Sequence, residues 1–535
     1  MKTMISSIIL ASCLALPLAS CSDSDVAPEQ KDWSTTTYFY SADAAMQDTY
    51  YKPTVGYVGD PMPFFDPVAG DFKVLYLQDF RPNPEGTYHP IWGVSTKDAA
   101  HYTSLGELVS CGTKKSQDAA IGTGSTIYDE ASKLYYTFYT GNKYLPTGDE
   151  SAQAVMVATS PDFKTWTKDR TFLLKGQDFG YDKNDFRDPF VFKGDDGKFH
   201  MLISTKKGGK GSLAEFVSDD LKNWTDNGVF MTMMWDRFYE CPDLFKMGDY
   251  WYLVYSEIHH AVRRVQYFKG RTLDELKACT ANDVARWPDA HEGFLDSRGL
   301  YAGKTASDGT NRYLWGWCPT RSGKDNTAVG ASPAEPEWGG NLVCYKLIQH
   351  EDGTLTLGQI DAVSEKYNQD VAVEVKESQN MTEADGTYTL AGSVEQPDAY
   401  MLMGRLGSHN KISFTVTTSN EWDKFGISMV RGSDSKKYYT MVVNPEDENN
   451  RKVNFEEQGV EGKGFIAGID GYVFARPADN VYNITIYTDN SICVMYINDV
   501  CSYTNRIYGI QKNCWSINSY NGANVKISNL KISQY

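Results

Sequence analysis

Three acidic residues stand beside a proline, and each one comes at the start of a short apolar run. Asp60 and Asp188 immediately precede a proline, and Glu240 stands two residues before one. Because proline cannot donate to a β-ladder, it is tolerated at the first residue of a strand. The pattern therefore predicts three strand starts that each present a carboxyl group. Carboxyl groups that share a partly dry pocket have pKa values that move apart, and an ionised and a protonated carboxyl group together can cleave a glycosidic bond.

Arg187 stands immediately before Asp188, which allows a simpler interpretation. An Arg–Asp pair ahead of a strand is often an ion pair that only neutralises its own charges. The recurrence of the acid–proline pattern at Asp60 and Glu240 favours a shared site instead.

The elements that must position these acids are β-strands. Tyr, Phe and Trp are abundant (35, 24 and 12 residues), and runs rich in Val, Ile and Thr are bounded by Gly, Asp and Asn. A Ser/Asp/Trp turn recurs at intervals of about 60 residues, at Ser95, Ser160 and Ser218. A repeat of this length holds about four short strands, which indicates propeller blades. We predict an all-β chain with a five-bladed β-propeller catalytic domain over residues 46–355. Asp60, Asp188 and Glu240 would open the first, third and fourth blades and converge on one funnel.

Charge and composition exclude several function classes. The formal net charge is −17, whereas a nucleic-acid-binding chain needs a basic surface. The chain has eight histidines without an HExxH motif, and its cysteines form no CxxC pair, so we expect no metal site and no cofactor. An acidic, aromatic-rich chain suits a neutral, hydroxyl-rich ligand.

Three motifs in this order resemble glycoside hydrolase family 32, the family of invertases, inulinases and levanases. The motifs are Asp60-Pro61, Arg187-Asp188-Pro189 and Glu240-Cys241-Pro242. The resemblance spans roughly residues 55 to 350 and implies that Asp60 is the nucleophile and Glu240 the acid/base. Asp188 would hold the furanose hydroxyls, and Arg187 would lower its pKa. The residues that the resemblance places against the sugar are Gln78, Trp92, Thr123, Arg187 and Trp317.

The chain departs from the family pattern around the nucleophile. The family usually has Asn before this Asp and Asn-Gly after its proline, whereas this chain has Gly59 before Asp60 and Met62-Pro63 after Pro61. One hydrogen-bonding amide at the fructosyl site is therefore missing. Linkage and chain-length preferences cannot be carried over from other members.

The first residues resemble a bacterial lipoprotein signal. Residues 1–20 would form the signal peptide, with an apolar stretch too short to span a bilayer, and Cys21 would carry the lipid. The Ser-Asp-Ser-Asp run that follows resembles the surface-export signal of Bacteroidetes lipoproteins. Residues 21–45 would be a tether. We therefore expect a monomer anchored to the outer membrane by lipid alone and facing outward. An ordinary cleaved secretory signal is the alternative.

Residues 370–535 read as a β-sandwich, because strand-like runs alternate with turns and no helical periodicity is sustained. The segment resembles the carboxy-terminal sandwich of family 32 enzymes. It is either a packing module without a site or a carbohydrate-binding module. Trp422 and Trp515 are the aromatic residues that would stack on sugar in the second case.

These inferences predict a retaining glycoside hydrolase that cleaves the β-fructosidic linkages of a fructan outside the cell. The partner would be a fructan polysaccharide or fructo-oligosaccharide, with levan favoured over inulin and internal cleavage slightly favoured. One alternative is an inverting arabinan- or xylan-cleaving propeller hydrolase. The other is a surface glycan-binding lipoprotein without activity, which would not need a proton donor.

Overall fold

The structure is a computed structural model of the 535-residue chain. The residues it describes are 49–80, 88–233, 238–257, 264–279, 293–321, 336–431, 438–445, 452–458, 472–474 and 476–535. The predicted signal peptide, Cys21 and the tether lie outside these residues. Within the described ranges, none of the helices has the length and apolar character needed to cross a bilayer.

The N-terminal part consists of antiparallel strand groups whose members follow one another in the chain. The first two groups are β1 (Tyr57–Asp66), β2 (Asp71–Asp79), β3 (Ile91–Thr96) and β4 (Thr103–Val109), then β5 (Ala120–Asp129), β6 (Leu134–Asn142), β7 (Gln153–Ser160) and β8 (Thr167–Lys168). The next are β9 (Phe186–Lys193), β10 (Phe199–Lys207), β11 (Lys210–Ser218) and β12 (Thr225–Thr232), then β13 (Glu240–Met247), β14 (Tyr250–Glu257) and β15 (Arg264–Gly270). The last is β16 (Tyr301–Ser307), β17 (Arg312–Arg321), β18 (Pro336–Gln349) and β19 (Leu355–Gly358).

The chain closes this arrangement by pairing its last group with its first. Strand β18 pairs with β1 through Val58 and Gly340, so both groups belong to one sheet. The leading strands of the groups contact one another in the order β1, β5, β9, β13, β16 and back to β1. Radial stacking of this kind leaves few exposed sheet edges. Short helical segments, η3 (Gly176–Phe179) and α1 (Leu273–Ala278), connect strands at the periphery.

The turn predicted from the sequence repeats as a structure. The hydroxyls of Thr96, Ser160 and Ser218 each bond to the Asp two residues later, at 3.1–3.2 Å. The residue after each Asp has a φ near +60° (Ala99 58°, Phe163 61°, Leu221 62°). The first copy therefore starts at Thr96, and its assignment to Ser95 was wrong by one position, because two adjacent hydroxyl residues fit the sequence pattern equally well.

The C-terminal part is a sandwich of two antiparallel sheets. One sheet contains β20 (Gln369–Val371), β22 (Met381–Ala384), β23 (Thr387–Ala391), β25 (His409–Thr418), β30 (Val481–Asp489), β31 (Ile492–Ile497), β32 (Cys501–Arg506) and β34 (Asn524–Gln534). The other contains β21 (Val375–Gln379), β24 (Ala399–Arg405), β26 (Lys424–Met429), β27 (Tyr438–Asn444), β28 (Lys452–Gln458), β29 (Tyr472–Val473) and β33 (Cys514–Tyr520). Alternate residues of β25 are buried, which is the pattern of a strand with one face on the core.

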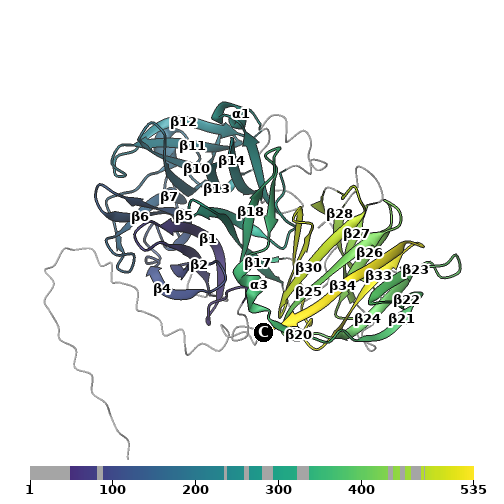
Figure 1. The fold of residues 1–535 in the computed structure, drawn as a ribbon. Helices are drawn as coiled ribbons and strands as arrows, with labels where there is room; N and C mark the ends of the chain where they lie inside the picture. The colour runs from purple at the N-terminus through teal and green to yellow at the C-terminus, as the bar shows by residue number, and fades with distance from the viewer. Residues whose placement is uncertain are drawn as a thin grey trace, which may run out of the picture.

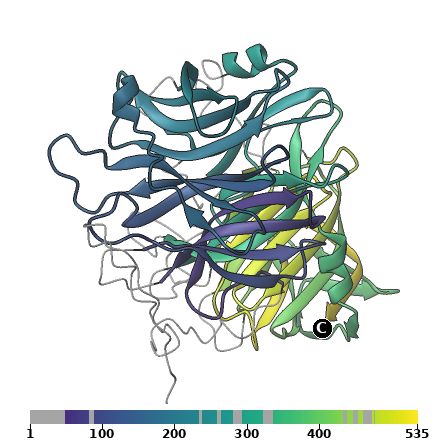
Figure 2. The ribbon, with the colours of Figure 1, turned by 90° about the vertical axis from the view of Figure 1, so that its left-hand side faces the viewer.

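The two parts share a buried polar interface. Figure 1 shows them side by side, with α3 (Asp361–Lys366) and the C-terminus at the junction, and Figure 2 looks through the first part to the sandwich behind it. Asp296 accepts hydrogen bonds from the Thr504 backbone N–H and from the Ser502 and Thr504 hydroxyls, each at 2.8 Å. The buried Arg506 guanidinium donates to the carbonyls of Cys318 and Pro319. These bonds satisfy charges that would be costly to bury alone, so they fix one part against the other.

The predicted all-β architecture, a propeller followed by a sandwich, is confirmed. The count of five blades stays a prediction, which the grouping of the strands favours. The cysteines of the described residues are free thiols, and most are buried. Trp515 is fully buried in the sandwich core and cannot stack on a sugar, whereas Trp422 is 41% exposed.

Candidate active site

The three acids lie at β-bulges of the leading strands. The ladder of β1 shifts between Gly59 and Met62, that of β13 shifts between Glu240 and Asp243, and a third shift adjoins Asp188 on β9. Asp60 and Asp188 adopt positive φ angles of 30° and 57°. A bulge re-aims a side chain, and non-glycine residues with positive φ concentrate at functional sites.

The position of the prolines differs from the prediction in one respect. Glu240 is the first residue of its strand, but Asp60 and Asp188 lie inside β1 and β9. Pro61 and Pro189 fall in the unpaired part of each bulge, where a missing N–H costs no ladder hydrogen bond. The acid–proline pairs therefore mark bulges as well as strand starts.

Two buried donors hold the carboxyl group of Asp60. Thr123 Oγ1 donates to Oδ2 at 2.8 Å, and Trp317 Nε1 donates to Oδ1 at 3.0 Å. Both donors are at most 1% exposed. Hydrogen bonds donated to a carboxylate favour its charged form and fix its direction. The structure thus gives Thr123 and Trp317 a role in orienting Asp60, and their predicted contact with the sugar stays a prediction.

Glu240 is held by a cation and a phenol. Arg187 Nη2 donates to Oε1 at 3.0 Å, and the Tyr301 hydroxyl donates to Oε2. The ring of Tyr301 lies edge-on to Trp317, with centroids 5.7 Å apart, so the supports of Glu240 and Asp60 touch each other. The side chain of Glu240 is 13% exposed, which leaves it open to a substrate.

Arg187 contacts several groups other than Asp188, its neighbour in the chain. Its Nη1 donates to Asp185 at 2.6 Å, and its guanidinium lies 3.9 Å from the ring centre of Phe238. Burial lowers the pKa of Arg187, but the negative charges of Glu240, Asp188 and Asp185 outweigh burial and raise it above the ordinary value. Arg187 therefore stays charged.

Asp188 is the most buried of the three acids, with 4% exposure. Its Oδ2 accepts the backbone N–H of Cys241 at 2.9 Å, and its own N–H donates to Thr140 Oγ1 at 2.8 Å. Burial raises the pKa of Asp188 to about 7; the charge of Arg187 opposes this rise, and Glu240 adds to it. Arg187 lowers this pKa as expected, but the expectation that the pKa of Asp188 lies below its ordinary value was wrong, because loss of water around the carboxyl group outweighs one neighbouring cation.

The remaining predicted sugar contacts, Gln78 and Trp92, are on β2 and β3. Gln78 is fully buried; its Nε2 donates to the Val55 carbonyl, and its Oε1 has no hydrogen-bond partner among the described residues. Trp92 is half-buried and packs edge-on against Phe80 at 6.1 Å. Their contact with the sugar stays a prediction.

Three residues of the site escaped the sequence reasoning. Asp185 bonds to Arg187 and also lies 3.3 Å from Lys206. Lys304 is 2% exposed and donates to the Gly124 carbonyl at 2.8 Å, directly beside Thr123. Trp338 packs against Trp317, with ring centres 5.9 Å apart. Only Asp185 carried a usable signal, since it stands two residues before Arg187.

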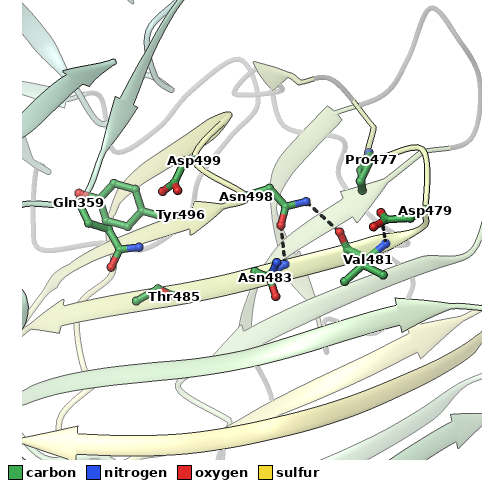
Figure 3. A pocket seen from close by; sticks show the side chains of 9 residues that line it. All are labelled: Gln359, Pro477, Asp479, Val481, Asn483, Thr485, Tyr496, Asn498 and Asp499. Atoms are coloured by element: carbon green, nitrogen blue, oxygen red, sulfur yellow. Dashed lines mark hydrogen bonds between the residues drawn. The ribbon is translucent and has the colours of Figure 1, made fainter. Parts of the chain in front are cut away.

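A separate groove lies on the sandwich, away from the acids (Figure 3). It has a volume of about 430 Å³ and is lined by Gln359, Pro477, Asp479, Val481, Asn483, Thr485, Tyr496, Asn498 and Asp499. Its walls are tied together, since Asn498 Nδ2 donates to the Val481 carbonyl at 2.8 Å and the Asn483 N–H donates to Asn498 Oδ1 at 2.7 Å. The one aromatic residue of this lining, Tyr496, is 4% exposed. Among the described residues, the groove therefore presents no exposed ring on which a sugar could stack, which favours a packing role for the sandwich.

Comparison with known proteins gives a match to two family models. The model "Glycosyl hydrolases family 32 N-terminal domain" matches residues 50–360, and the model "GH32, BT1760-like, C-terminal domain" matches residues 353–532. The chain belongs to glycoside hydrolase family 32.

Relatives within family 32 are distant in sequence. The beta-fructofuranosidase "insoluble isoenzyme CWINV2" of Arabidopsis thaliana is 26% identical over 310 residues, 52% of this chain and 50% of that protein. The "Fructan 6-exohydrolase" of Beta vulgaris is 24% identical, over 50% of this chain and 46% of that protein. The chain thus spans about half the length of these relatives. The structure of fructan 1-exohydrolase IIa from Cichorium intybus shares the fold, with a TM-score of 0.66, 16% identity and coverage of 91% and 97% of the two chains.

Proposed function

We propose that this family 32 protein is a retaining β-fructosidase that hydrolyses a fructan outside the cell. The observation that carries the proposal is the support of Asp60 by Thr123 and Trp317. Two donors aimed at one carboxyl group fix the direction of its oxygens, and a nucleophile needs this orientation. The second carboxyl group, Glu240, is held beside it by Arg187 and Tyr301 and is partly exposed.

The first half of the reaction uses both groups. Asp60 attacks the anomeric carbon of the fructosyl unit while Glu240 gives its proton to the departing glycosidic oxygen. The bond between the anomeric carbon and that oxygen breaks, and a fructosyl ester forms on Asp60. The charge of Arg187 beside Glu240 then stabilises the carboxylate that remains after proton transfer.

The second half regenerates the enzyme. Glu240, now ionised, takes a proton from water, and the resulting hydroxyl attacks the anomeric carbon and releases Asp60. The charges of Glu240 and Asp60 both reach Asp188, whose Oδ2 accepts the Cys241 N–H and whose carboxyl group is in a dry environment. There it accepts hydrogen bonds from sugar hydroxyls, and these strengthen as positive charge develops on the ring.

The family and the names of the relatives support the proposed substrate class. Two of the relatives described above are named for fructan hydrolysis. We favour levan over inulin as the substrate, and comparison of the two polymers tests this choice. We favour internal cleavage over release of terminal fructose, because the proposed lipid-anchored surface protein would meet a polymer too large to import. Gly59 in place of the family's Asn supports a fructosyl site that differs from that of the better-known members.

Reducing-sugar release by the chain lacking residues 1–21 tests the function directly. Levan, inulin, sucrose and arabinan are compared, and product sizes are followed by chromatography; a ladder of oligosaccharides supports internal cleavage. The Asp60→Ala variant should lose turnover while its fold and its affinity for fructo-oligosaccharide stay largely intact. NMR of the first product should show the anomer of the substrate linkage, which requires carboxyl groups about 5–5.5 Å apart. Inversion of the anomer, or hydrolysis of arabinan alone, would replace the proposal with the inverting alternative.

We also propose that Cys21 carries a lipid and anchors the chain to the outer membrane, facing outward. The apolar stretch before Cys21 and the acidic run after it support this location. Mass spectrometry of the N-terminal peptide should find a lipidated Cys21, and protease added to intact cells should remove the protein. The Cys21→Ala variant should be released into the soluble fraction, and its retention in the membrane would contradict the proposal.

A further inference from the structure

Gly59 stands directly before Asp60, and the indole of Trp338 occupies the space that a side chain at position 59 would need. A Cβ atom built on Gly59 would lie 2.2 Å from Cη2 of the Trp338 indole and under 3 Å from two further ring atoms. No side chain fits at position 59 while the indole stays in place. The family's usual Asn at this position and an indole at Trp338 therefore exclude each other.

The indole is fixed from several sides. The ring of His89 stacks on it, with centroids 3.9 Å apart and planes 16° from parallel. His89 Nε2 in turn lies 3.7 Å from Asp79 Oδ1. The backbone is fixed as well, since strand β18 pairs with β1 through Gly340 and Val58, two residues from Asp60 in the chain. A side chain held in this way is pre-organised, so it loses little conformational freedom when a ligand binds.

The indole also packs against the ring that supports Asp60. Its ring centre lies 5.9 Å from that of Trp317, whose Nε1 donates to Asp60. Trp338 is half-buried, so part of its surface is open. An indole offers an apolar body and one N–H donor, which suits a ligand with both C–H faces and hydroxyls.

We propose that Trp338 is a substrate-binding residue that contacts the fructosyl unit beside Asp60, and that the Gly59–Trp338 pair replaces the family's Asn as a determinant of substrate preference. The indole supplies an apolar wall for the C–H groups of the furanose and an N–H for a hydroxyl, in place of the missing amide. This inference rests on the proposed function, since it names a determinant of the same site. His89 is a positioning residue, because it holds the ring without reaching the site itself.

The substitutions Trp338→Ala and Trp338→Phe separate the two contributions of the indole. We expect Trp338→Ala to raise KM for levan or inulin about tenfold, because one well-packed aromatic contact is lost. Trp338→Phe keeps an apolar ring without the N–H. Its KM should lie between that of the unmodified protein and that of Trp338→Ala. Val394→Ala removes an exposed apolar side chain of the sandwich and serves as the control, with unchanged KM and kcat.

A reciprocal pair of variants tests the exclusion between the two positions. Gly59→Asn alone should lose activity at least about tenfold, because the amide and the indole compete for one space. Combining it with Trp338→Ala should recover activity relative to Gly59→Asn, although each change alone is harmful. Melting temperatures identify any variant that does not fold, in which case Trp338→Leu replaces Trp338→Ala and is read by the same KM criterion.

The outcomes distinguish this inference from the function on which it rests. If the unmodified chain releases no sugar from any fructan or from sucrose, the proposed function fails. If the chain is active and Trp338→Ala changes neither kcat nor KM by more than about twofold, the inference is overturned and the function stands. An equal loss in Val394→Ala, or a double variant no better than Gly59→Asn, overturns it as well.

Discussion

Replacing Asp188 by Asn should lower kcat and, above pH 7, make the folded protein more stable. The substitution keeps the shape of the side chain and an oxygen that can accept the Cys241 N–H, and it removes the charge. Two charge-assisted hydrogen bonds to sugar hydroxyls are worth about 3–6 kcal/mol, so kcat should fall by about 10²–10⁴. KM should change little, because these bonds are stronger in the transition state than in the ground state.

The effect on stability follows from the raised pKa. Burial raises the pKa of Asp188 from 3.8 to about 7. The folded protein therefore binds the proton more tightly than the unfolded chain, and its stability falls as pH rises from about 4 to about 7, then levels off. The raised pKa of Asp188 thus lowers the free energy of unfolding above pH 7 by an amount on the order of 1–4 kcal/mol. Asp188→Asn cannot ionise, so it should be more stable than the unmodified protein above pH 7, with the gap closing towards pH 4.

Urea unfolding at several pH values, with kcat measured on the same samples, tests both halves of this prediction. Asp219→Asn is the control, because the side chain of Asp219 is 80% exposed and should confer neither effect. If Arg187 and Asp188 formed only a stabilising ion pair, Asp188→Asn would unfold more easily at pH 7 and keep its kcat. That result would refute the assignment of Asp188 to the reacting site.

Three further substitutions test the supports of the site and the domain interface. Glu240→Ala should lose most activity on polymer and much less on a fructosyl donor whose leaving group needs no proton, and equal losses on both would show that Glu240 is not the acid. Asp185→Ala removes the partner of Arg187 Nη1, so kcat/KM should fall about tenfold with a shifted pH profile; a change in melting temperature alone would reduce Asp185 to a structural role. Asp296→Ala leaves the buried N–H and hydroxyl of Thr504 without their acceptor, and urea unfolding should show a loss of about 3 kcal/mol, whereas a loss below about 1 kcal/mol would contradict the role given to this interface.

The architecture was predictable because its signals are short in range. A strand is written in a few consecutive residues, and the turn that follows the third strand of a group needs only a hydroxyl, an Asp and a residue that tolerates positive φ. The prediction slipped by one residue at Thr96, where two hydroxyl residues are adjacent and only the backbone decides which one bonds to Asp98.

The supports of the acids were only partly predictable. Thr123 and Trp317 were expected near the sugar, and the structure shows them bonded to Asp60. The pairing of Trp338 with Gly59 carried no local signal, because it joins strands from opposite ends of the first domain. In the sequence, Gly59 shows only that the amide of the family's usual Asn is absent. Only the packing shows that the Trp338 ring fills the space.

The sequence by itself predicted which residues would carry the chemistry, since acid–proline pairs are local patterns that need no partner, and their catalytic roles stay predictions. It also determined the β-class of both parts through periodicity and turn residues. Tertiary structure decided the ionisation and pairing of those residues. Arg187 and Asp188 are neighbours in the chain, yet Arg187 bonds to Asp185 and Glu240, and the pKa of Asp188 rises. The physical reason is that desolvation depends on everything packed around a group, and closing the ring of strands removes water from Asp188 more effectively than one adjacent cation can compensate.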